Sequence, residues 1–242
     1  MMMRSVAESS DIESVMEWFE EGIEDGENGI LIYPNLQIFR QIYTQYVKDH
    51  LVAREEEEEE QQKEKGNDDD NNDYLDNNNN RRRRKAQSLI PRIILIATFY
   101  DTVNTVKHYL SAVGVDVQSH IDHGSLMIID AFDGYYPNID GMRKLVVTLS
   151  ERARKEGRIG LSVISNMGFF FLYDGDGTAS ELISYEASLV PKTDGGNVRG
   201  FNCYHTRDYE NLVDSQQKEL LDQGQKKSLE ITESAADVPL DA

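Results

Sequence analysis

The chain contains a single cysteine, Cys203, and five prolines among its 242 residues. One cysteine excludes an internal disulfide and a cysteine-rich zinc site, and it suits a reducing compartment. No apolar run approaches the ~20 residues that a membrane-spanning helix needs, and residues 1–10 lack the pattern of a secretory signal. We therefore expect a soluble, cytoplasmic protein with no membrane partner.

Basic residues are also scarce. The chain has 25 Lys and Arg residues against 44 Asp and Glu residues, which gives a formal net charge of -19. A molecule of this charge is repelled by nucleic acid and by anionic membrane surfaces. Direct DNA binding is therefore not expected, except through the local basic run at residues 81–85.

A glycine-rich phosphate loop is missing as well. Such a loop ends in lysine and a hydroxyl residue, so that backbone N–H groups and the ammonium group cradle the phosphates. The corresponding turn between the strand at 29–33 and the next helix is Pro34–Asn35, without glycine or lysine. The sequence thus does not support ordinary phosphate binding, and we predict no cofactor.

Apolar runs alternate with amphipathic segments along the rest of the chain. The runs predict strands at 29–33, 91–99, 125–130, 159–164, 169–173, 198–204 and 227–231, with a β-like pair at 115–117. Three- and four-residue spacing of apolar positions predicts the main helices at 11–25, 36–51, 102–113, 140–156, 182–190 and 209–221. Unbroken apolar strands are typical of a parallel sheet covered on both faces. We predict an α/β fold, a three-layer αβα sandwich with a mainly parallel central sheet.

Composition divides the chain into one domain and three segments without core residues. We predict a disordered N-terminus at 1–10, a single domain at 11–232, and a disordered acidic tail at 233–242. A low-complexity insertion at 54–88 interrupts the domain with six glutamates, an Asp/Asn tract and a basic block. It has too little apolar surface to offset the entropy of ordering, so we expect disorder. It is either a tolerated loop expansion or a segment that binds a charged partner.

The order of several motifs resembles the MEDS family, a sensory domain named for methanogens, methylotrophs and the DcmR regulator. The matching segments are 19–27, 110–117, 124–133, 142–157, Tyr185–Glu186 and 201–204 before a helix. This resemblance implies a reduced relative of the RecA/KaiC fold that lacks the phosphate loop. Two features depart from the family: residues 1–10 lack its histidine and aromatic motif, and Ser165-Asn166-Met167 stands where relatives tend to have Gly-Glu-Met.

Candidate ligand-binding residues gather where the predicted strands end. Ligands of open α/β sheets bind outside the carboxyl ends of the strands. Asp130, Asp133 and Tyr135 follow the strand at 125–130, and Cys203 lies near the end of another strand. The family resemblance adds Glu186. We predict that these five residues line a site for a small ligand or a partner protein. For Asp130, we favour capping or anchoring of its loop over metal binding.

A transition-metal site is a second interpretation. His120 and His123 have ligand spacing, and Cys203 and His205 point the same way on a strand. The alternative is two solvated loop histidines and a small buried cysteine, which we favour.

These observations favour a non-catalytic sensory or signalling module. One alternative is a degenerate nucleotide- or metal-binding protein of ATPase type that uses Asp130. Another is an interaction scaffold that acts through the charged insertion. The sequence identifies neither the ligand nor the signalling partner.

Overall fold

Seven strands form one sheet in the computed structural model of the chain. The structure describes residues 6–9, 12–65, 91–135, 139–172, 197–213, 215, 218–219 and 227–232. The strands are β1 (Val6–Ser9), β2 (Glu27–Tyr33), β3 (Ile93–Thr98), β4 (Leu126–Asp130), β5 (Leu161–Asn166), β6 (Val198–His205) and β7 (Lys227–Ile231). They lie in the order β1-β7-β2-β6-β5-β3-β4, and each neighbouring pair is parallel. All carboxyl ends therefore lie along one edge of the sheet.

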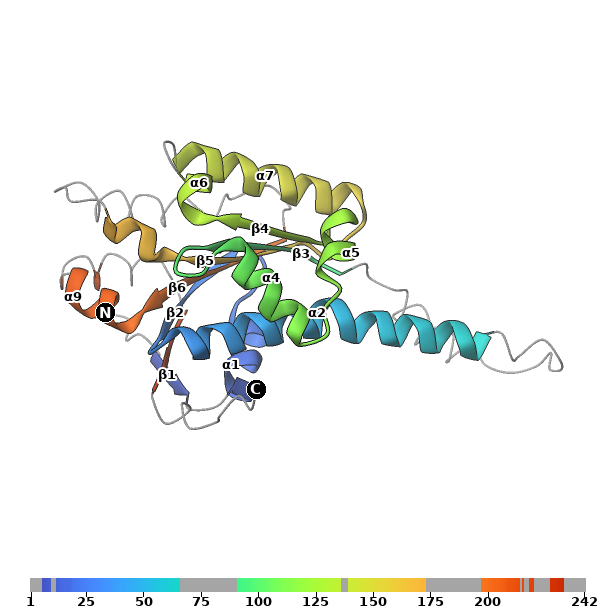
Figure 1. Cartoon of the computed structure of the whole chain (residues 1–242), viewed down its shortest axis with the longest axis horizontal. Helices are drawn as coiled ribbons and strands as arrows, with labels where there is room; N and C mark the ends of the chain where they lie inside the picture. Colours follow the sequence, from blue (N-terminus) through green and yellow to red (C-terminus); the bar gives the residue numbers. More distant parts are fainter. Residues whose placement is uncertain are drawn as a thin grey trace.

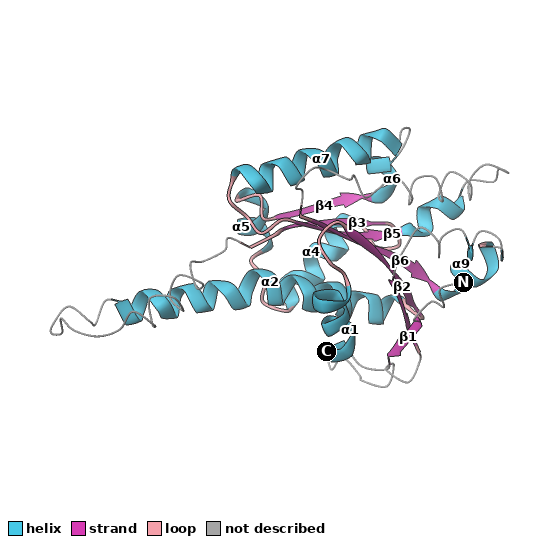
Figure 2. Ribbon diagram, turned by 180° about the vertical axis from the view of Figure 1, so that it is seen from behind, coloured by secondary structure: helices cyan, strands magenta, loops and turns pink. Residues whose placement is uncertain are grey.

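Helices cover both faces of this sheet (Figures 1 and 2). On one face, which we call the α2 face, lie α1 (Ile12–Glu17), the π-helical segment η1 (Trp18–Gly22), α2 (Leu36–Lys65), α4 (Val103–Ala112) and α5 (Val117–Asp122). On the other, the α7 face, lie α6 (Ala131–Tyr135), α7 (Ile139–Lys155), the 3-10 helix η2 (Met167–Leu172) and α9 (Thr206–Leu212). The predicted three-layer αβα fold with a parallel sheet is confirmed.

Burial explains why the strands read as unbroken apolar runs. All six residues of β3 and of β5 are buried, and so are six of the seven in β2. Side chains alternate between the two faces of a strand, and here each face is covered by a helical layer. Polar residues therefore remain mainly at the strand ends.

The connections leave the carboxyl edge in opposite directions. The chain passes from β2 and β3 to helices on the α2 face, whereas it passes from β4, β5 and β6 to helices on the α7 face. Because β2 neighbours β6, and β3 neighbours both β5 and β4, the connections diverge at these three pairs. In α/β proteins, ligands bind outside the carboxyl ends of the strands where neighbouring connections diverge in this way.

The predicted N-terminal disorder at 1–10 is wrong for part of that segment. Residues 6–9 form β1, which pairs in parallel with β7 from Val6↔Ser228 to Ser9↔Ile231. Without β1, the outer edge of β7 would present unpaired N–H and C=O groups. This long-range pairing is invisible in the composition of a ten-residue segment.

The predicted start of the disordered insertion, residue 54, is also wrong. Helix α2 continues through the glutamate run to Lys65 and projects beyond the helical layer (Figure 1). Residues 54–65 consist only of Arg, Glu, Gln and Lys, which are strong helix formers, so a helix already begun continues through them. The remainder of the insertion, residues 66–88, lies outside the described residues.

Two short segments differ from their predicted strand structure. Residues 167–172 form η2, because Asn166 Oδ1 accepts the N–H of Gly168 at 3.0 Å and turns the chain directly after β5. The β-like pair at 115–117 leads instead into α5. Asp116 caps the first turn of this helix, because its Oδ1 accepts the N–H of Ser119 at 3.0 Å. The predicted helix at 182–190 and the tail at 233–242 lie outside the described residues.

Within the described ranges, no helix is both long enough and apolar enough to cross a membrane.

Candidate ligand-binding site

Four adjacent strands end in polar residues at the carboxyl edge. Tyr33, His205, Asn166 and Thr98 are the last residues of β2, β6, β5 and β3, which are neighbours in that order. Each stands two positions after a residue of the α2-face core: Leu31, Cys203, Ile164 and Ile96. Side-chain alternation therefore places all four on the α2 face. We call these four residues the edge row.

A buried hydrogen bond joins the first and the third residue of the edge row. Asn166 Nδ2 donates to the hydroxyl of Tyr33 at 2.8 Å, and both side chains are almost fully buried. The Tyr33 ring also stacks on Phe39 of α2, with ring centroids 4.6 Å apart. These contacts fix the Tyr33 side chain between α2 and the end of β5.

His205 both ends β6 and begins α9. Its Nδ1 accepts the backbone N–H of Arg207 at 3.1 Å, so the ring caps the helix. The same ring meets Tyr33 edge to face, with centroids 5.4 Å apart, and approaches the ring of Tyr100 at 6.1 Å. Three rings from three different connections thus meet at this edge.

Tyr100 bridges the edge above this cluster. It is 39% exposed, and its hydroxyl donates to Asp208 of α9. Its ring packs against Gly168, where an added Cβ would lie 2.7 Å from the ring. Glycine at 168 is therefore what allows Tyr100 to cover the end of β5.

An ion pair holds α2 against the loop after β3. Arg40 donates from Nε and Nη2 to the Asp101 carboxylate at 3.0 and 2.6 Å, and its guanidinium lies 4.8 Å from the ring centre of Tyr109. The hydrogen bonds that Arg40 donates to Asp101 raise the pKa of Arg40 above its ordinary value. Thr98 joins the same loop by donating its hydroxyl to the carbonyl of Asp101 at 2.8 Å.

The five predicted site residues are only partly brought together. Asp130 ends β4 on the α2 face, where its Oδ1 accepts the N–H of Phe132 at 2.8 Å and anchors the loop. Cys203 is fully buried in β6, and desolvation raises the pKa of its thiol. Three strand spacings, about 14 Å, separate β4 from β6. Asp133 is exposed on α6, the side chain of Tyr135 is not among those described, and Glu186 lies outside the described residues.

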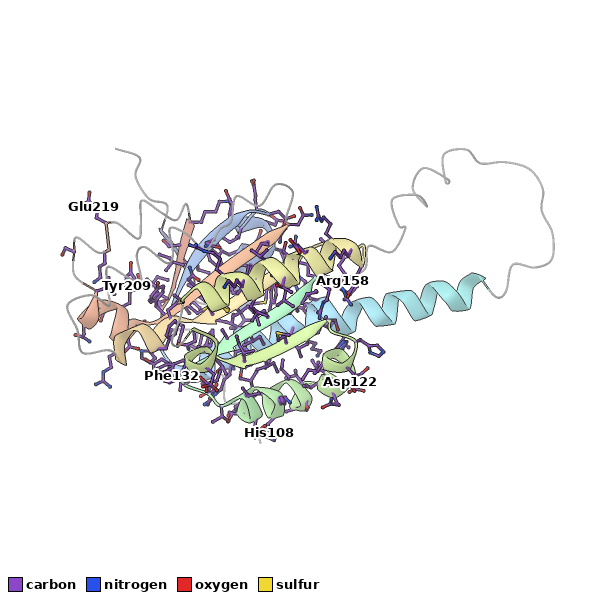
Figure 3. The ribbon with its side chains drawn as sticks, turned by 90° about the horizontal axis from the view of Figure 1, so that it is seen from above. His108, Asp122, Phe132, Arg158, Tyr209 and Glu219 are labelled. Atoms are coloured by element: carbon purple, nitrogen blue, oxygen red, sulfur yellow. The ribbon has the colours of Figure 1, made fainter. Side chains whose placement is uncertain are left out.

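The four predicted metal ligands lie at opposite edges of the sheet. His120 and His123 belong to α5 and its end, at the amino end of β4, whereas Cys203 and His205 lie at the carboxyl end of β6. Figure 3 shows the same separation: Asp122 and Arg158 lie at one end of the sheet, and Phe132 and Tyr209 lie at the other. His120 is buried with Nδ1 3.1 Å from Ser125 Oγ, while His123 is exposed. Among the residues described, no group of three or more His, Cys, Asp or Glu side chains could hold a metal ion.

Sequence reasoning missed the centre of this site. From the sequence alone, Tyr33 is only the end of a predicted strand, and Asn166 is only a departure from the family pattern. The signal available in the sequence was that several buried strands end in a polar residue. Which of these residues meet depends on strand order, and Tyr33 and Asn166 are 133 positions apart.

No family model matches this chain, and no curated protein matches it either.

Proposed function

We propose that the chain is a sensory or signalling module that binds a small ligand at the carboxyl edge of its sheet and acts in the cytoplasm. The observation that carries this proposal is the edge row. Tyr33, His205, Asn166 and Thr98 lie side by side where the loops diverge to opposite faces. The resemblance to the MEDS sensory family supports the same function.

The turn after β2 supports binding without phosphoryl transfer. The residues between β2 and α2 are Pro34 and Asn35, and Asn35 Oδ1 accepts the N–H of Ile38 at 3.0 Å. A side chain thus caps α2 at the position where a phosphate loop would present its glycines and lysine. Binding would therefore use the side chains of the edge row and the bridging Tyr100.

A ligand that occupies this edge would link three connections that the sheet holds separately. Tyr100 belongs to the loop after β3, Asn166 precedes η2, and His205 begins α9. Contacts with all three would favour one arrangement of the loops over others, which is how binding energy produces a signal. Thr206–Leu212 is the element most directly coupled, because His205 is its cap.

A thermal-shift screen of small metabolites on the full chain tests this proposal. A ligand at about 100 times its Kd stabilises a protein by about 2.7 kcal/mol, which raises the melting temperature by several degrees. We expect at least one metabolite to do so, and we expect Tyr100→Ala or Asn166→Ser to abolish most of the shift.

Val113→Ala provides the matched control. Val113 is also an exposed apolar side chain, but it lies at the opposite end of α4 from the carboxyl edge. The ligand shift should survive in this variant. A screen without any shift, or a shift that is the same in Tyr100→Ala as in Val113→Ala, would contradict the proposal.

A further inference from the structure

The orientation of the Asn166 amide is fixed by its neighbours. The backbone N–H of Gly168 only donates, so the atom 3.0 Å away must be Oδ1. Nδ2 therefore faces the Tyr33 hydroxyl at 2.8 Å and donates to it. The oxygen of Tyr33 is the acceptor in this hydrogen bond, and its own proton is left to donate elsewhere.

The Tyr33 hydroxyl keeps that proton. Desolvation by burial raises its pKa well above the ordinary value of 10.0, against the opposing effect of the Asn166 hydrogen bond. Among the residues that the structure describes, the hydrogen bond of the Tyr33 hydroxyl is the one that it accepts from Asn166. Tyr33 therefore presents an O–H donor at the carboxyl edge.

His205 presents a second donor beside it. Its Nδ1 accepts the N–H of Arg207, and a neutral imidazole then carries its hydrogen on Nε2. The edge-to-face contact of the two rings, with centroids 5.4 Å apart, places both donors in the same region.

The acceptors near these donors are already engaged. Asn166 Oδ1 accepts the N–H of Gly168, and Asn35 Oδ1 accepts the N–H of Ile38. The Asp101 carboxylate accepts from Arg40, and the Asp208 carboxylate accepts from Tyr100. What the edge row offers a ligand is therefore mainly hydrogen-bond donors. A site that offers mainly donors is complementary to a ligand group that accepts hydrogen bonds and carries no proton to donate.

We propose that the ligand presents an oxyanion, a carboxylate or a phosphate, to Tyr33 Oη and His205 Nε2. This inference rests on the proposed function and names the chemical class that the site recognises. Charge-assisted hydrogen bonds to an oxyanion are about twice as strong as neutral ones. The Tyr33 side chain is fully buried, so entry of the ligand requires movement at this edge, where Tyr100 lies beside His205 and is tethered to Asp208.

The test is an NMR titration of the full chain with acetate, succinate and inorganic phosphate in turn, with chloride keeping the ionic strength constant. The backbone amides of Gly168 and Arg207 report directly, because they donate to Asn166 and His205. We expect saturable shifts of both amides with at least one of these anions, and none with neutral acetamide. The three anions distinguish a carboxylate ligand from a phosphate ligand.

Two variants assign the binding to the proposed donors. Tyr33→Phe removes the O–H and keeps the ring, and His205→Asn removes Nε2 while keeping an oxygen that caps α9. Each should weaken anion binding at least tenfold. Tyr43→Phe is the matched control. Tyr43 is also a buried tyrosine, and its hydroxyl has no hydrogen-bond partner among the described residues. It should bind as the unmodified chain does.

The outcomes separate this inference from the proposed function. Anion shifts that persist in Tyr33→Phe, or equal shifts with acetamide, would overturn the oxyanion assignment. If no anion binds while a neutral metabolite stabilises the chain and loses its effect in Tyr100→Ala, the ligand site stands and its proposed polarity is wrong. If neither anion nor metabolite binds, both proposals fail.

Discussion

His50 shows how the contacts of a single residue link two helices of this fold. Its Nε2 lies 2.9 Å from a carboxylate oxygen of Glu20, and its Nδ1 lies 2.8 Å from the carbonyl oxygen of Tyr46. A carbonyl oxygen only accepts, so Nδ1 donates to Tyr46 and Nε2 faces the carboxylate. The His50–Glu20 contact ties η1 to α2.

Glu20 makes this contact pH dependent on the acid side. Hydrogen bonding from His50 is the main reason that the pKa of Glu20 is lowered below 4.5, and burial opposes the shift. The stabilisation is therefore fully present above pH 4.5 and is lost as the pH falls through the lower pKa of the folded state. We predict that Glu20→Gln reduces the loss of stability between neutral pH and pH 3, measured by urea unfolding at a series of pH values.

The exposed neighbour Glu21 supplies the control for this measurement. Glu21→Gln removes the same charge one position along η1 and should leave the acid-side slope nearly unchanged. If Glu20→Gln and Glu21→Gln gave the same slope, the contact with His50 would contribute nothing to folding.

At the scale of elements, α2 consists of two parts with different physical support. Its first half buries a continuous set of core side chains that ends with Leu51. Residues 54–65 contain no apolar residue at all, so their helical structure rests on propensity and on continuation from the packed half. The two parts should respond differently to substitution.

A proline in the extension tests this difference. We predict that Glu58→Pro lowers the helical signal in circular dichroism but changes the free energy of unfolding by less than about 0.5 kcal/mol. Leu51→Ala, in the packed half, should cost about 2–5 kcal/mol because it leaves a cavity in the core. A large loss of stability in Glu58→Pro would mean that the extension packs against the rest of the protein.

The elements that could be predicted from the sequence were those whose pattern is local. The strands at β3, β4, β6 and β7 follow from their apolar runs, and α7 follows from its amphipathic spacing. The run Phe169–Phe171 also reads as a strand, but the side chain of Asn166 turns the chain into η2 before that run begins. The same limit applies to the site: the position of the carboxyl edge follows from the fold class, whereas the meeting of Tyr33 with Asn166 follows from strand order.

For the whole molecule, the sheet joins the two ends of the described chain. β1 pairs only with β7 in the sheet, and β7 in turn pairs with β2. Leu229 and Ile231 of β7 are buried. A four-residue strand at the start of the chain therefore protects one margin of the core.

Deleting residues 1–9 tests this role. We predict a lower melting temperature and concentration-dependent self-association, because the outer edge of β7 would then be free to pair with another copy. Light scattering coupled to size-exclusion chromatography measures the association. If the shortened chain remained as stable and as dispersed as the full chain, β1 would be dispensable.

Helix α2 separates the low-complexity segment of this protein from its proposed ligand-binding edge. Thirty residues make the helix about 45 Å long, whereas the longest strand, of eight residues, spans about 26 Å. The helix starts at the carboxyl edge, so its last turns emerge past the opposite edge (Figure 1). Insertions or deletions directly after Lys65 are therefore far from the edge row. A fluorescent label attached directly after Lys65 should leave ligand recognition unchanged.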